Sequence, residues 1–242
     1  MLRHADEYYT KVVEYIDSVE QETQVLYYYQ LGVLKTAQSE TLRGREEYYT
    51  EGKKLLIDSL MLLDKSIALS TDNDMDYMFS FILNNKSIAV RQLLDLQLHN
   101  AKNDAEIIAT CNEALINIDD AIKALNIETQ QLTYAFLNLN KADIIMQIWT
   151  SMESFGIMNN NRLYLDTILT EALNSLSQAG KFISSNYKGI VLGKKAMVLY
   201  RIAVMSNDKA DYQKSIAAYD EALQALPENS NLQQNMYMAA NK

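Results

Sequence analysis

The sequence predicts an all-α protein built from stacked antiparallel helix hairpins. Among its 242 residues there are one proline and seven glycines, whereas an all-β chain of this length needs many more turn residues. Hydrophobic residues make up 48% of the chain, enough to build a continuous core. Apolar residues recur at spacings of three and four over long stretches, which is the period of an amphipathic helix.

The first hairpin is expected within residues 3–70. The apolar stripe from Leu2 to Ala37 predicts one long helix, with a break near residues 18–22 as the alternative. A turn at residues 41–44 follows, and a second helix contains Tyr49 and Ile67. The polar tract at residues 70–74 ends this helix, because short polar side chains compete for backbone hydrogen bonds.

Seven more helices are expected after this hairpin. They run over about 75–99, 104–125 and 128–153, then to Gly180, to residues 206–208 and to Pro227, before a short terminal helix. Short loops predict antiparallel neighbours. We therefore expect one domain over residues 1–242, with hairpins at 3–70, 74–126, 128–180 and 185–227, a terminal helix at 229–240, and about nine helices in all.

An internal repeat supports this pairing. Four predicted second helices carry a small residue at intervals of 55, 51 and 50 residues: Ser66, Ala121, Ala172 and Ala222. Seven positions before each stand Ser59, Ala114, Leu165 and Ser215. A small residue on an inner face allows the neighbouring helix to approach closely, and hairpins that cannot bury their apolar faces alone must stack.

The last unit resembles the tetratricopeptide repeat. Residues 211–229 carry the aromatic, small and proline positions of its second helix at Tyr219, Ala222 and Pro227. The interval here is longer than the family's roughly 34 residues, so the resemblance implies a relative with extended helices. It also implies an α-solenoid whose first helices line a concave surface that binds peptides.

Three predicted first helices share a polar pair on that surface. The pairs are Asn85 and Lys86, Asn140 and Lys141, and Lys194 and Lys195. If the hairpins stack in parallel, asparagine amides could hold a peptide backbone and lysines a carboxylate, like the carboxylate clamp that the resemblance implies. The alternative is that these residues form the solvated face of each helix or cap a neighbour.

Sixteen tyrosines are a second unusual feature. They cluster in the N-terminal hairpin, where the candidate interface residues are Tyr27, Tyr28, Tyr48 and Tyr49. Exposed tyrosines favour interfaces, which would make this hairpin a surface for a homodimer or a partner protein. The alternative is packing between the first two helices, with hydroxyls at the rim.

Charge and cysteine content bear on partners and location. A net charge of −9 argues against nucleic-acid binding and against docking on anionic membranes. No window approaches about 18 uncharged apolar residues, so membrane insertion is not expected. The N-terminal residues show no signal sequence, and the one cysteine, Cys111, forms no internal disulfide, which favours the cytoplasm. The alternative is a chain from which a signal sequence has been removed.

No catalytic or metal constellation is visible. His4 and His99 are far apart and neither has metal-ligand spacing, while Cys111 lies on an apolar helix face. No cofactor is expected. The leading hypothesis is thus a non-enzymatic scaffold or adaptor that binds a peptide or protein segment in its groove.

Two other functions remain open. A sensor or carrier of a small ligand predicts an enclosed apolar pocket, around Trp149, Phe155 and Phe182. An enzyme with an unrecognised site predicts converging titratable groups with perturbed pKa values.

Overall fold

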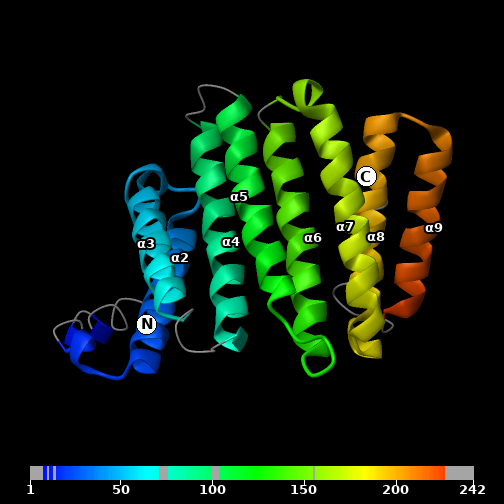
Figure 1. Ribbon diagram of the computed structural model, residues 1–242. Helices are drawn as coiled ribbons and strands as arrows, with labels where there is room; N and C mark the ends of the chain where they lie inside the picture. Colours follow the sequence, from blue (N-terminus) through cyan, green and yellow to red (C-terminus); the bar gives the residue numbers. More distant parts are fainter. Residues whose placement is uncertain are drawn as a thin grey trace. The chain divides into compact units, whose positions relative to one another are not determined.

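The computed structural model describes residues 8–9, 11–12, 15–70, 76–99, 104–154 and 156–226. Its regular elements are all α-helices or short 3₁₀-helices, and no strand occurs within these ranges (Figure 1). The prediction of an all-α protein is confirmed for this part of the chain. The terminal helix expected at 229–240 lies outside the described residues.

The helices fall into two compact units, Met1–Leu125 and Asn126–Lys242. The first unit contains α2 (Gln21–Leu42), α3 (Glu51–Ser70), α4 (Asp76–His99) and α5 (Asp104–Lys123). The second contains α6 (Gln131–Ser154), α7 (Arg162–Phe182), α8 (Ser185–Ser206) and α9 (Lys209–Ala225). Three 3₁₀-helices, η1 (Ile16–Ser18), η2 (Glu46–Tyr49) and η3 (Asn159–Asn161), lie in the connections.

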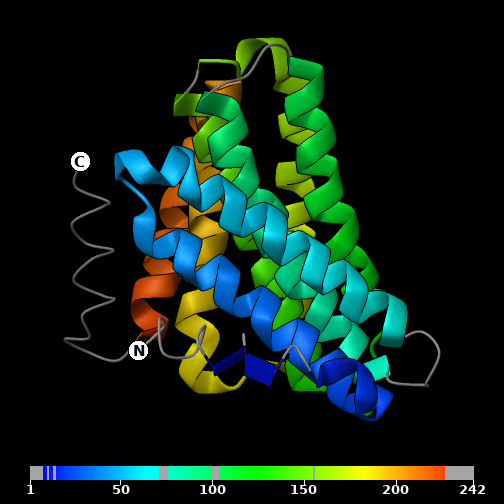
Figure 2. The same ribbon diagram turned by 90° about the vertical axis from the view of Figure 1, so that its left-hand side faces the viewer.

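Within each unit the helices pack as consecutive pairs. The closest partners are α2 with α3, α4 with α5, α6 with α7 and α8 with α9, and α3 also meets α4 as α7 meets α8. Figure 2 shows α2 and α3 side by side along their length. The pairs agree with the four expected hairpins, while their stacking into one continuous array remains a prediction.

Small residues at seven-residue intervals form the seam of the first hairpin. Ser66 and Ser59 on α3 donate hydroxyl hydrogen bonds to the carbonyls of Val25 and Gly32 on α2, at 2.9 and 2.8 Å. Ser39 on α2 donates in the opposite direction, to the carbonyl of Gly52 at 3.1 Å. Such short side chains reach the opposite backbone only when two helices lie very close. The three bonds therefore define both the close approach and the antiparallel register.

The same arrangement recurs in the last hairpin. Ser215 on α9 donates to the carbonyl of Ala196 on α8 at 3.3 Å. Gly189, one heptad earlier on α8, is packed so tightly that a Cβ atom there would lie 2.5 Å from Leu226. Ala222 completes the seam and is fully buried.

In the other two hairpins, small residues at corresponding positions are also buried. They are Ser80, Ser87, Ala114 and Ala121 in α4 and α5, and Ala135, Ala142, Ala172 and Ala179 in α6 and α7. All eight repeat positions noted in the sequence are buried, including Leu165, where a large residue replaces a small one. The 50–55-residue interval thus marks the inner face of each hairpin, where the seam serines of the first and last hairpins donate to backbone carbonyls of the opposite helix.

Three expectations about helix ends need correction. Tyr49 does not belong to the second helix, because it lies in η2 and α3 begins at Glu51. A single long N-terminal helix is wrong, because the backbone is extended at Val19 and Glu20, between η1 and α2. Ser18 donates to the carbonyl of Tyr15 at 2.7 Å, a local bond that competes with the helix. The break allows Ile16 to fold back into a buried cluster with Tyr27. The alternative break near residues 18–22 is confirmed.

Gly180 does not cap α7, which continues to Phe182. The cap is Ile183, whose backbone N–H donates to the carbonyl of Ala179. The turn predicted at residues 41–44 is present, and Gly44 adopts a φ of 82° that only glycine reaches without strain. The α8 helix ends as expected, with Asn207 in the left-handed conformation and Asp208 capping α9 through the N–H of Ala210.

Candidate functional site

Side chains of α6 and α8, the first helices of the two hairpins in the second unit, contact one another at three places. At the first place the rings of Phe136 and Tyr187 meet edge to face, with centroids 6.0 Å apart. One heptad further along, Lys194 of α8 forms an ion pair with Asp143 of α6. Another heptad along α8, Arg201 reaches Glu153 of α6 at 3.2 Å. We call these six residues the α6–α8 face.

The contacts of this face define the relative direction of α6 and α8. Both the ring pair and the lysine pair join residues 51 positions apart, and the arginine pair joins residues 48 apart. Positions therefore rise together along α6 and α8, which means that the two helices run parallel. These contacts join positions 51 or 48 apart, whereas the sequence repeat pairs Asn140 with Lys194 at an interval of 54, so α6 and α8 meet about one helical turn or more out of the register of the repeat.

Arg201 is held from several sides. Besides its ion pair, its guanidinium lies 5.8 Å from the ring centroid of Trp149 and 6.0 Å from that of Tyr200. Burial raises the pKa of the neighbouring Tyr219 hydroxyl, and the positive charge of Arg201 opposes this shift. The guanidinium is therefore a fixed element of the structure.

The predicted groove residues of the second unit have different surroundings. Lys194 belongs to the α6–α8 face, whereas Lys141 is mostly buried and pairs with Glu171 of α7 at 3.2 Å. Asn140 and Lys195 are both half-buried, on α6 and α8 respectively. Lys141 thus pairs with an acid of its own hairpin, whereas Lys194 pairs with an acid of the preceding hairpin.

In the first unit, the corresponding residues lie on α4. Lys86 pairs with Asp64 of α3 at 2.8 Å, linking two successive hairpins. Asn85 donates to the hydroxyl of Tyr29 at 3.1 Å and to the carbonyl of Phe81 at 2.9 Å. Burial raises the pKa of Tyr29, and the hydrogen bond from Asn85 opposes the shift. The role of all six residues in binding remains a prediction.

The candidate interface tyrosines are mostly inside the first unit. Tyr27, Tyr28 and Tyr48 are buried, and Tyr49 is exposed. Tyr27 donates to the carbonyl of Tyr9 at 2.8 Å, and Lys65 donates to the hydroxyl of Tyr28 at 2.6 Å. Burial is the main cause that raises the pKa of Tyr27. Packing explains the three buried rings, while self-association through this hairpin remains a prediction.

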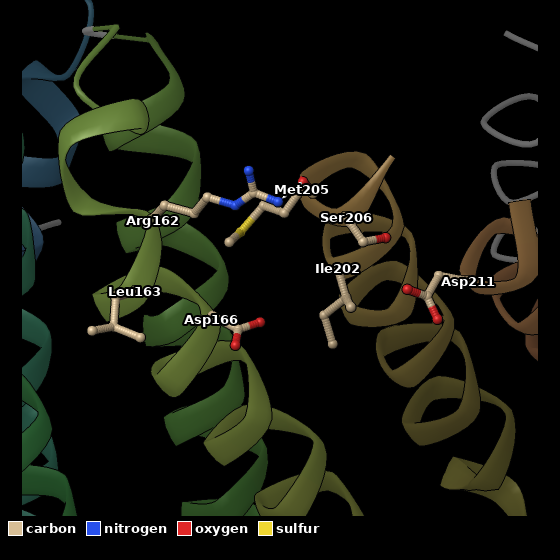
Figure 3. Close-up of a pocket in the computed structure, with 7 residues that line it drawn as sticks. All are labelled: Arg162, Leu163, Asp166, Ile202, Met205, Ser206 and Asp211. Carbon is tan, nitrogen blue, oxygen red and sulfur yellow. Dashed lines mark hydrogen bonds between the residues drawn. The ribbon is translucent and has the colours of Figure 1, made fainter. Parts of the chain in front are cut away.

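A pocket of about 470 Å³ lies in the second unit, where α7 begins and α8 ends (Figure 3). Ile202 and Met205 of α8 supply apolar surface, and Asp166 of α7 and Asp211 of α9 approach from opposite sides. Arg162 donates to the carbonyl of Met205 at 2.7 Å. Leu163 and Ser206 complete the lining.

The carboxylate of Asp211 is already engaged. Lys214 bonds it at 2.8 Å, and this bond, followed by one from Ser206, lowers the pKa of Asp211. The same ion pair raises the pKa of Lys214. The pocket therefore combines apolar walls with polar groups of both signs.

This pocket is not the one expected around Trp149 and Phe182. Trp149 is fully buried, and Phe182 packs edge to face on Tyr134 with centroids 5.8 Å apart. Phe155 and His4 lie outside the described residues, and the fold places His99 at the end of α4. Cys111 is fully buried, as its apolar neighbours predict.

The residues that the structure describes contain no group of three or more histidine, cysteine, aspartate or glutamate side chains that could hold a metal ion. Among the described helices, none combines the length and apolarity needed to cross a membrane.

The α6–α8 face was only partly visible in the sequence. The sequence points to Lys194, while the other five residues come together only in the structure: Phe136, Asp143, Glu153, Tyr187 and Arg201. The available signal was the shared seven-residue interval on two helices that are 51 residues apart. No family model matches the chain, and no curated protein is found to be similar to it.

Proposed function

We propose that the chain is a non-enzymatic scaffold that binds a peptide or protein segment on the α6–α8 face. The observation that carries this proposal is the exposed pair Phe136 and Tyr187 at one end of two helices joined by ion pairs. These rings are 38% and 44% exposed, so a partner could bury substantial apolar area on them. Interfaces are enriched in aromatic residues and arginine, and both types occur on this face.

Rigidity supports the same function. Ion pairs at Asp143 and Glu153 join α6 to α8, and the small-residue seam holds α8 against α9. A surface that is already ordered loses little conformational entropy when a partner binds, so more of the contact energy appears as affinity. The resemblance to tetratricopeptide repeats, whose first helices line the binding surface, is a further argument for α6 and α8. The buried single cysteine is compatible with the cytoplasm, where we place the protein.

The test is selection of peptide ligands from a random library on the full chain, followed by measurement of their affinities. The variant Phe136→Ser with Tyr187→Ser removes both exposed rings, and we expect it to bind the selected peptides at least about tenfold more weakly. The matched control is Ile116→Ser with Ile216→Ser, which removes exposed apolar side chains from α5 and α9. Equal affinities of both double variants and the unmodified chain would refute the proposed face.

A second function is favoured by the pocket between α7, α8 and α9. Its volume of about 470 Å³ lies within the range of small-ligand sites. Carriage of a small molecule there predicts that a ligand raises the melting temperature and that Met205→Trp, which fills the pocket, abolishes the increase. If the double ring variant leaves peptide affinity unchanged while the small ligand still raises the melting temperature, the pocket rather than the α6–α8 face is the functional site.

A further inference from the structure

We infer that the segment bound at the α6–α8 face is basic, with lysine or arginine side chains that contact Asp143 and Glu153. This inference rests on the proposed function and adds the chemistry of the partner. It reverses the charge expected from the sequence, in which the lysines would hold a carboxylate of the partner. The reason is that the carboxylate of each ion pair is more exposed to solvent than the cation.

In both ion pairs of the face, the carboxylate is the outer member. The side chain of Asp143 is 50% exposed and that of Lys194 is 28% exposed. For Glu153 and Arg201 the values are 43% and 23%. The same order holds for two other interhelical pairs, Lys86 with Asp64 and Lys141 with Glu171. The cations lie with their long apolar stems against the helices, and an approaching partner meets the carboxylates first.

The inner cations are poorly available to a new anion. Arg201 already contacts Glu153 and two aromatic rings, so a carboxylate from a partner would have to displace these contacts. The outer carboxylates have the opposite property. A carboxylate has about four lone-pair sites, and an ion pair with one cation leaves capacity for a second cation.

The neighbouring rings suit the same kind of partner. Phe136 and Tyr187 expose ring surface one heptad before Asp143 and Lys194. Aromatic faces attract cations and also bury the methylene stems of lysine and arginine. The net charge of −9 adds a long-range attraction for basic segments and a repulsion for acidic ones.

The helix geometry gives a spacing for the partner. Asp143 and Glu153 are ten residues apart on α6, which corresponds to roughly 15 Å along the helix axis. An extended peptide advances about 3.3 Å per residue, so its two basic residues should be four or five positions apart. A third contact, with the rings, should lie about three residues further along the peptide, because Phe136 precedes Asp143 by about 10 Å.

The test uses three fluorescein-labelled peptides and the full chain. Each peptide has a glycine–serine background and one leucine, with two arginines, two glutamates or two glutamines at the proposed spacing. Fluorescence anisotropy measures their affinities at low salt and at about 0.15 M salt, where exposed charges are largely screened beyond about 8 Å. We expect the arginine peptide to bind at least about threefold more tightly than the glutamine peptide, and the glutamate peptide to bind most weakly.

Matched variants locate the effect. Asp143→Asn with Glu153→Gln should remove the preference for arginine, whereas Asp220→Asn with Glu221→Gln on α9 changes the net charge equally and should retain it. Asp143→Lys with Glu153→Lys should prefer the glutamate peptide. Circular dichroism confirms that each variant is folded.

The outcomes separate this inference from the proposed function. A preference for the glutamate peptide that depends on Phe136 and Tyr187 would overturn the basic partner while leaving the binding face intact. If the ring variant binds all three peptides as tightly as the unmodified chain does, both the proposed binding face and the inferred basic partner are refuted. A preference for arginine that is unchanged in the Asp143 and Glu153 variant would also refute the inference.

Discussion

Gly32 allows the sharpest test of how the hairpins are built. It lies in the middle of α2, at the point where Ser59 of α3 donates to its carbonyl. A Cβ atom at this position would lie 2.8 Å from Cγ of Leu63 and 3.3 Å from the carbonyl oxygen of Ser59. Leu63 is fully buried and its Cγ lies near the backbone end of the side chain, so we expect Gly32→Ala to push α2 and α3 apart.

The expected change in the free energy of unfolding combines two destabilising terms and one stabilising term. Overpacking of a well-packed core costs about 1–3 kcal/mol. Separation of the helices also weakens the seam hydrogen bonds of Ser59 and Ser66, each worth about 1 kcal/mol. Replacing glycine by alanine in a helix returns about 1 kcal/mol. We therefore expect a net loss of about 1–3 kcal/mol in the free energy of unfolding.

Gly180 supplies the matched control. It is also helical, but its nearest obstacle is Cγ1 of Val191 at 3.8 Å, an ordinary van der Waals distance. Gly180→Ala should therefore stabilise the fold by about 0.5 kcal/mol, since only the helix propensity changes near the end of α7. Urea unfolding followed by circular dichroism measures both variants. If Gly32→Ala proves as stabilising as Gly180→Ala, the close seam between α2 and α3 is refuted.

Three further predictions concern the second unit. Because Lys214 lowers the pKa of Asp211 in the folded chain, ionised Asp211 stabilises the fold above its unfolded pKa. This contribution is lost as the pH falls through the folded pKa, so Asp211→Asn should flatten the acid limb of urea midpoints measured against pH. Trp149 is the only tryptophan and is fully buried, so its emission should be at short wavelength, and Arg201→Ala, which uncovers one side of the ring, should shift it to longer wavelength. Ala222→Leu should lower the free energy of unfolding by about 1–3 kcal/mol in the same urea assay, because its seam has no room for a larger side chain. An unaltered pH profile, an unaltered spectrum or an unaltered midpoint would contradict the respective prediction.

Much of the helix pattern was predictable because it depends on local chemistry. Prolines and glycines are scarce, so the described helices extend for 17 to 24 residues before a polar tract or turn ends them. The end of α8 at Asn207 and Asp208 follows directly from residue types that favour caps. Gly180 shows the limit of this reasoning. The glycine predicts a helix end, but α7 continues to Phe182 because a glycine permits a helix to end without requiring it.

The candidate site was less predictable because the positions of charged residues in the sequence do not show which member of an ion pair will be exposed to solvent. The repeat predicts that Lys86, Lys141 and Lys194 offer cations to a partner, as part of the Asn–Lys and Lys–Lys pairs of the first helices. Each instead pairs with an acid on another helix, and the stems of these lysines are largely covered. Which member of an ion pair faces the solvent depends on side-chain length and on the helix that lies beneath.

The sequence by itself determined the all-α class, the four hairpins and the small residues of their seams, because these follow from periodicity and from the volume that close helices allow. Only the tertiary structure decided which side chains are buried and which lie at the surface. Burial placed Tyr27, Tyr28 and Tyr48 inside the first unit, and the parallel packing of α6 and α8 brought Phe136 to Tyr187. Contacts between residues 51 positions apart depend on how two hairpins pack against each other, which a local sequence pattern does not determine.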